Sequence, residues 1–159
     1  MGSHLVEKET EFVRFTNGDL VNPGAFHWIK ILSVSPQKPH YSGKVVILID
    51  ETTQSQAEYT SMAFRASPRA IVVGSTTAGA DGNVSRIALP GGLISMISGI
   101  GVFYPDKRPT QRVGIVPDIE KRPTIAGIVT GRDEVLEEAL RQILGPEVPA
   151  AQIEKMATQ

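Results

Sequence analysis

The chain has 159 residues, of which 41% are apolar and 21% charged, a balance usual for a globular domain rather than a disordered or membrane protein. Sixteen basic and seventeen acidic residues give a net charge of -1, which provides no positive field to hold nucleic acid or an anionic membrane. The absence of cysteine excludes disulfides, thiol catalysis and cysteine metal sites.

The N-terminal part of the chain is the least periodic. Residues 1–4 have no apolar signal core and are interpreted as a remnant of cloning, so they say nothing about targeting. Residues 5–40 are expected to be an irregular segment, with weak alternation at 12–15, a turn at 22–24 and a short strand or helix at 26–32.

A strand, a sharp turn and a helix are predicted in the middle of the chain. Residues 44–50 form a continuous β-branched run that predicts a buried strand, and residues 56–66 carry an apolar face that predicts a helix ending before Pro68. Residues 70–74 predict the next buried strand. Because the crossover of a β-α-β unit is right-handed, we expect these two strands to be parallel.

The last third of the chain combines short strands with one clear helix. Apolar stretches between glycines predict two or three tightly turning strands over 85–104, and the segment 91–98 is either a hairpin or an edge that an extended peptide could join. Residues 134–144 have one apolar face and predict a helix, which Gly145 and Pro146 end. Residues 146–159 are predicted to be a loosely attached tail.

Ser55 stands just after the first buried strand, at the start of the predicted helix. The first backbone N–H groups of a helix have no helical partner, and together with the helix dipole they would stabilise an oxyanion, with the Gln56 N–H as the first donor. The same residues also match S-x-x-E, the capping box in which Ser55 and Glu58 satisfy each other's backbone donors. Spacing alone therefore leaves two interpretations open, a helix cap and a nucleophile.

Four ordered sequence motifs surround this position. They lie at residues 41–58, at 74–80, at 104–106 together with 114–118, and at 131–136. Over roughly residues 41–144 the chain resembles the tail-specific, or C-terminal processing, serine peptidases, and Ser55 falls on the family's nucleophile. Residues 41–145 would then be the C-terminal part of the peptidase catalytic domain.

The resemblance implies an α/β fold, a crotonase-like or Clp-protease-like β-α spiral with a partly parallel sheet and an incomplete core. It implies a serine endopeptidase that hydrolyses peptide bonds near the C-termini of proteins or peptides, with Ser55 as nucleophile, the Gln56 N–H in the oxyanion hole and Glu58 in support. Protein or peptide substrates are the expected partners, and no cofactor, metal, nucleotide or CoA is expected. The family also suggests an extracytoplasmic location, in the periplasm or cell envelope of a bacterium.

The sequence departs from the family at the general base. Many members have a Ser-Lys dyad, but Ala80 occupies the position of the lysine and Val84 lies near that of the glutamine that orients it. A methyl group cannot accept a proton, so this dyad is absent. A branch similar to the tricorn peptidases uses a histidine from earlier in the chain, but His4 belongs to the remnant, and His27 and His40 are interpreted as structural or surface residues.

Residues 1–40 also contain nothing that resembles the family's upstream strand, which supplies another oxyanion-hole donor. We therefore expect the parent protein to be the enzyme and the chain by itself to be inactive. The alternative is a non-catalytic peptide-binding or scaffolding module that has lost its general base. An acyl-CoA enzyme of the related crotonase-like fold is disfavoured, because the sequence has no visible CoA-binding feature.

Overall fold

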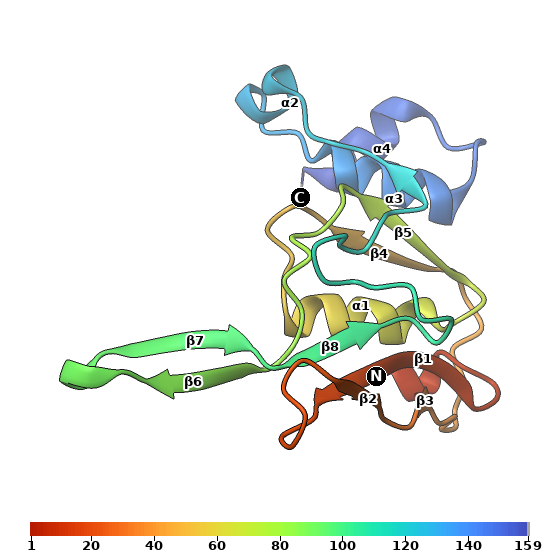
Figure 1. The fold of residues 1–159 in the computed structure, drawn as a ribbon. Coiled ribbons are helices and arrows are strands. Elements are labelled where there is room, and N and C mark those ends of the chain that lie inside the picture. Colours follow the sequence, from red (N-terminus) through yellow and green to blue (C-terminus); the bar gives the residue numbers. More distant parts are fainter. Residues whose placement is uncertain (159) are drawn as a thin grey trace.

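The computed structural model describes residues 1–158, in which two sheets, one projecting hairpin and four α-helices are arranged as Figure 1 shows. The chain begins with a single 3-10 turn, η1 (Gly2–His4). Within the described residues, no helix is both long enough and apolar enough to cross a membrane.

An antiparallel sheet is built around β1, which pairs with β3 along its first half, with β2 along its second half, and also with β8. The four strands are β1 (Thr10–Gly18), β2 (Phe26–Trp28), β3 (Leu32–Val34) and β8 (Ile100–Phe103). The register shifts between Glu11 and Val13, and this irregularity places the consecutive residues Phe12 and Val13 both in the core. The N-terminal segment at 5–40, expected to be irregular, thus contributes three strands.

The parallel sheet confirms the predicted β-α-β unit. Its strands are β4 (Val45–Ile49), β5 (Ala70–Gly74) and β9 (Ile119–Glu120), in the order β4-β5-β9 and all parallel. The connection between β4 and β5 is α1 (Gln56–Arg65), which ends within one residue of its predicted limit. Figure 1 shows α1 between the two sheets, and it contacts β1, β4 and β5.

The core fills the space around α1. It includes the side chains of Val13 from β1, Met62 from α1, Val72 from β5 and Ile115, none of which is more than 2% exposed. Burying such side chains is the main source of stability for a domain of this size. The core therefore fixes α1 relative to both sheets.

Three further helices follow the sheets. α2 (Ile125–Val129) extends away from the body, and α3 (Glu134–Leu144), with the predicted bounds, packs on β4 and β5. The structure differs from the expectation of a loose tail, because α4 (Ala150–Ala157) packs on α3 and Ile153 is only 1% exposed.

A two-stranded hairpin, here called the arm, projects from the body into solvent (Figure 1). It consists of β6 (Val84–Ala88), the 3-10 turn η2 (Pro90–Gly92) and β7 (Ile94–Ser98). Every residue of both strands is exposed. The three strands β6, β7 and β8 agree with the two or three predicted over 85–104, and 91–98 forms the hairpin alternative.

Candidate active site

Ser55 lies in the turn between β4 and α1 and is the N-cap residue of the helix. Its backbone has φ 54° and ψ -121°, a conformation that glycine adopts freely but that costs other residues about 1–3 kcal/mol. Its side chain is exposed, and the neighbouring Gln56 N–H donates no hydrogen bond within residues 1–158. The turn thus presents a hydroxyl and a free backbone donor together at the positive end of a helix.

The loop that leads to Ser55 is organised by Asp50. Its Oδ1 accepts hydrogen bonds from the backbone N–H groups of Thr52 and Thr53, both at 2.9 Å, and from both threonine hydroxyls. These bonds hold the pKa of Asp50 below its ordinary value, with the Thr52 hydroxyl as the largest cause. Asp50 and the two threonines therefore stabilise the loop that leads to Ser55, and Ser55 itself is the N-cap residue of α1.

Glu58 is completely buried, and both of its carboxylate oxygens accept hydrogen bonds. Oε2 accepts from the backbone N–H groups of Ser55 at 3.1 Å and Ala80 at 3.0 Å. Oε1 accepts from the Gly79 N–H at 2.9 Å and from the Thr77 hydroxyl. A carboxylate has about four lone-pair sites, so Glu58 is fully occupied as a positioning group that joins the Ser55 turn to the 77–80 loop.

The predicted capping box is present: the Glu58 carboxylate accepts from the Ser55 N–H, and the Ser55 hydroxyl oxygen faces the Glu58 N–H at a geometry outside that of a regular hydrogen bond. The Ser55 hydroxyl makes no cap bond of good geometry to the helix. The local S-x-x-E pattern therefore holds the backbone of the turn, and the Ser55 hydroxyl donates no hydrogen bond within the described residues.

The 77–80 loop packs against the 110–115 loop, backbone to backbone. The Ile115 N–H donates to the Thr77 hydroxyl at 2.7 Å, and the Arg112 N–H donates to the Gly79 carbonyl at 2.7 Å. Gly79 has φ 65°, and a Cβ there would lie 3.0 Å from the Gly114 nitrogen. Glycine at 79 therefore permits both the backbone conformation and the close approach of the two loops.

No base for Ser55 is found among the described residues. Ala80 is exposed and offers no proton acceptor, and no histidine or lysine in residues 1–158 forms a hydrogen bond with the Ser55 hydroxyl. His27 pairs instead with Asp19, at 2.8 Å between Nε2 and Oδ2. His40 precedes β4 while Ser55 follows it, so a five-residue strand of about 16 Å separates them.

The sequence of this chain matches a known family. The model of peptidase family S41 matches residues 7–121, well over half of the chain. The chain belongs to peptidase family S41. Comparison with curated protein sequences found no match.

Solved structures show the fold of this S41 chain. A protein from Parabacteroides merdae described as a peptidase is 23% identical, with a TM-score of 0.83 over 91% of this chain and 46% of its own. Mature CPAF in complex with lactacystin is 16% identical, with a TM-score of 0.69 over 97% of this chain and 41% of its own. The photosystem II D1 C-terminal processing protease is 18% identical, with a TM-score of 0.59 over 93% of this chain and 35% of its own.

These matches confirm the predicted fold class, a mixed α/β core of the crotonase-like and Clp-protease-like type with a parallel sheet. The S41 chain spans less than half the length of each of the three structures. The family match begins at residue 7 and so takes in β1, β2 and β3, which precede the motifs seen in the sequence.

Asp81 is a further buried carboxyl beside the S41 motif at 74–80. Its residue exposure is 5%; Oδ1 accepts from the Gly82 N–H at 2.7 Å, and Oδ2 is buried without a partner among the described residues. Burial is the main cause that raises the pKa of Asp81 to about 6, and the charge of Glu58 adds to it. A carboxyl that titrates near neutral pH therefore lies next to Ala80.

Gln111 joins this loop to the arm. Its Nε2 donates at 2.9 Å to the carbonyl of Asp81, before β6, and at 2.9 Å to the carbonyl of Ile100, after β7. One side-chain amide thus holds both roots of the arm together and ties them to the loop that contacts Glu58.

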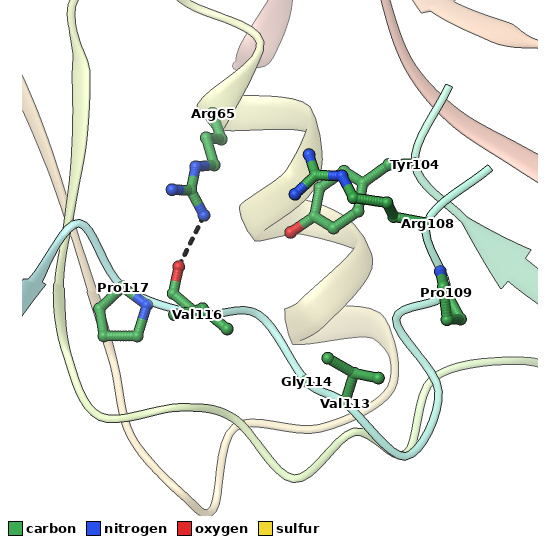
Figure 2. A pocket seen from close by; sticks show the side chains of 8 residues that line it. All are labelled: Arg65, Tyr104, Arg108, Pro109, Val113, Gly114, Val116 and Pro117. Atoms are coloured by element: carbon green, nitrogen blue, oxygen red, sulfur yellow. Dashed lines mark hydrogen bonds between the residues drawn. The ribbon is translucent and has the colours of Figure 1, made fainter. Parts of the chain in front are cut away.

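A cavity of about 480 Å³ extends from the C-terminal end of α1 to the 110–115 loop, whose Val113 and Gly114 line part of it (Figure 2). Arg65, the last residue of α1, donates to the Val116 carbonyl at its edge at 2.7 Å, and Arg108 stacks on Tyr104. A ten-residue helix is about 15 Å long, so Arg65 lies at the opposite end of α1 from Ser55.

Sequence reasoning named Ser55, Gln56 and Glu58 as candidates and did not name two other residues of this region, Thr77 and Asp81. Thr77 links Glu58 to the 110–115 loop, and its only sequence signal was a hydroxyl inside the second motif. Asp81 was visible as an acidic residue between Gly79 and Gly82, but its burial could not be foreseen. Within the described residues, no group of three or more histidine or acidic side chains could hold a metal ion.

Proposed function

We propose that this chain carries the nucleophile part of a serine endopeptidase site, and that Ser55 attacks the scissile carbonyl. The observation that supports this role is the strained and exposed Ser55, whose backbone Glu58 holds and whose hydroxyl donates no hydrogen bond among residues 1–158. Strained backbone in a non-glycine residue persists where surrounding bonds enforce it, and such positions cluster at active sites. Membership of peptidase family S41 supports peptide bonds as the substrate class.

In the proposed mechanism, Ser55 Oγ forms the bond to the carbonyl carbon and its proton passes to a general base. The Gln56 N–H and the positive end of α1 stabilise the oxyanion that develops on the carbonyl oxygen. Glu58 does not receive the proton, because its two oxygens already accept four hydrogen bonds. Its role is to fix the turn in which the nucleophile lies.

The base is proposed to come from another part of the parent protein. Ala80 cannot supply it, and the arrangement suits a histidine from an earlier segment, as in the tricorn-like branch. The parent would then act near the C-termini of proteins or peptides, as the tail-specific family resemblance suggests. The isolated 159-residue chain, with nucleophile but no base, is expected to cleave no peptide.

The second candidate is a peptide-binding or scaffolding module that retains the fold without catalysis. The observation in its favour is that no basic side chain among residues 1–158 forms a hydrogen bond with the Ser55 hydroxyl. Under this alternative Glu58 would serve only to hold two loops together, and the parent gene would encode no further histidine motif.

A fluorophosphonate probe applied to the full-length parent separates the two candidates. We expect labelling of Ser55 and hydrolysis of an unfolded protein substrate, both lost in Ser55→Ala and both kept in the control Ser35→Ala, which changes an exposed loop serine. A fully active Ser55→Ala parent would contradict the proposed nucleophile. A parent that binds peptides but shows neither labelling nor hydrolysis would establish the binding module instead.

A further inference from the structure

The arm has apolar side chains on both of its faces, and its two strands pair with no other strand in the described part of the chain. Six of its apolar residues are at least 45% exposed: Val84, Ile87, Leu93, Ile94, Met96 and Ile97. A two-stranded hairpin by itself is only marginally stable in water, and an exposed apolar edge strand is a template for pairing with another chain. We therefore expect a partner to cover the arm.

The hydrogen bonds of the arm show which of its backbone groups are unpaired. Near the tip the Leu89 N–H donates to the Leu93 carbonyl at 2.8 Å, and at the root the Gly99 N–H donates to the Asn83 carbonyl at 3.2 Å. Because bonded and non-bonded pairs alternate along an antiparallel ladder, the odd-numbered residues of the two strands bond to each other. The even-numbered residues direct their N–H and C=O groups outwards, namely Ile94, Met96 and Ser98 in β7 and Val84, Arg86 and Ala88 in β6.

The two outer edges of the arm differ in charge. Arg86 is the only charged residue between positions 84 and 98, and it is the middle residue of β6. Two β6 edges paired about their middle residues would place Arg86 directly opposite its own copy, and like charges in that position destabilise a sheet. β7 has no charge, and its middle residue Met96 has its N–H and C=O on the free edge. β7 is therefore the edge that can pair with a copy of itself.

We propose that two copies of this chain associate through their arms, with β7 antiparallel to β7 of the second copy about a two-fold axis at Met96. The two hairpins then form one four-stranded sheet. In this register Met96 lies opposite Met96, and Ile94 lies opposite Ser98 of the second copy. All the outward-directed N–H and C=O groups of β7 are thus paired by a single two-fold operation.

The same register brings the tip of one arm to an aromatic pocket of the other copy. Continued by one residue, it places Leu93, which is 65% exposed, opposite Gly99 of the second copy. Gly99 lines a pocket of about 440 Å³ at the root of the arm, together with Phe26 and Trp28, which are 63% and 39% exposed. The free edge and the pocket are spaced along one chain as this dimer requires, which favours a second copy over an unrelated protein.

The available area limits the strength of this association. The six apolar residues leave on the order of 600 Å² of surface in water on each copy, below the ~800 Å² that each partner buries in a standard interface. We therefore expect a reversible dimer with a Kd of about 10 μM. The association involves no residue of the Ser55 turn, so it does not depend on the proposed function.

Sedimentation equilibrium of the 159-residue chain tests the dimer. The average mass should rise from that of the monomer at about 1 μM towards twice that value at about 100 μM. Met96→Lys places two like charges opposite each other at the axis and should raise the Kd at least about tenfold. The control Leu20→Lys, at a loop residue 99% exposed, should leave the Kd unchanged. Circular dichroism of each variant verifies that the chain is folded.

Disulfide formation tests the register. The chain has no cysteine, so a single introduced cysteine can form a disulfide only with another copy. Met96→Cys should cross-link readily, because the Cα atoms of a hydrogen-bonded antiparallel pair are about 5.5 Å apart, within the range of a disulfide. Ser98→Cys by itself should not, because its two copies would lie four residues apart along the strands, about 13 Å. An equimolar mixture of Ile94→Cys and Ser98→Cys should give the mixed disulfide.

Several outcomes would overturn the proposal. A monomeric mass at every concentration, or a dimer that Met96→Lys leaves intact, would exclude the arm as the interface. Cross-linking of Ser98→Cys alone as fast as that of Met96→Cys would exclude the register. Cross-linking of Met96→Cys in the 159-residue chain but not in the full-length parent would show that the rest of the parent covers the arm. Ser55→Ala should dimerise as the wild type does, so this test and that of the proposed nucleophile can fail independently.

Discussion

Replacing Asp81 by asparagine tests how its buried carboxyl affects stability. Burial raises the pKa of Asp81 from 3.8 to about 6, with Glu58 contributing further. Ionised Asp81 therefore destabilises the folded chain by about 3 kcal/mol at neutral pH, since one pKa unit corresponds to about 1.4 kcal/mol. The protonated acid carries no such penalty, so the loss of stability begins as pH rises through 3.8 and is complete above about 6.

Urea unfolding of wild type and Asp81→Asn over a range of pH measures this effect. Relative to wild type, the variant should gain up to about 3 kcal/mol of unfolding free energy between about pH 4 and about pH 8. Glu9→Gln, at an exposed position, serves as the control and should show no comparable gain. A difference between wild type and Asp81→Asn that is constant with pH, or that favours wild type as pH rises, would refute the reasoning.

Three more substitutions examine the Ser55 turn and the loop that contacts it by urea unfolding. Ser55→Gly should be more stable than Ser55→Ala by about 1–2 kcal/mol, because glycine relieves the strain at φ 54°; equal stability would argue against strain. Glu58→Gln should lower the free energy of unfolding by about 2–4 kcal/mol, because an amide cannot accept four hydrogen bonds. The control Glu11→Gln, at an exposed position, should leave the free energy of unfolding almost unchanged. Gly79→Ala should lower the free energy of unfolding by about 1–3 kcal/mol. The control Gly18→Ala should lower it less, because a Cβ at position 18 has no atom within 4 Å. An unchanged stability of Gly79→Ala would contradict the close packing of the two loops.

The strands and helices of the central and C-terminal parts could be predicted because the spacing of their apolar residues matches the faces that they bury in the fold. The predicted strand at 70–74 and helix at 134–144 have the bounds of β5 and α3. β1 could not be predicted in the same way, because its irregular register between Glu11 and Val13 interrupts the alternation of buried and exposed residues. α4 was not predicted, because its buried face is covered by α3 and the sequence of the tail does not indicate this contact.

The candidate site was predictable only where its bonds are local. S-x-x-E indicated the bond between Glu58 and the Ser55 N–H, three residues apart. The bonds from Glu58 to Thr77 and Ala80 join segments about 20 residues apart and depend on how the two loops fold together. Asp81 could not be predicted for the same reason: the burial of its Oδ2 without a hydrogen-bond partner depends on the tertiary structure around it and not on the adjacent residues.

Because Glu58 is the shared acceptor of three backbone amides, it also determines how this region fluctuates. The amides of Ser55, Gly79 and Ala80 all lose their acceptor if the Glu58 side chain leaves its place. Native-state hydrogen exchange should therefore give these three amides one common opening free energy, although they belong to two different loops. The Ser55 turn and the 77–80 loop would then open as a single cooperative unit, so neither could change its conformation without the other.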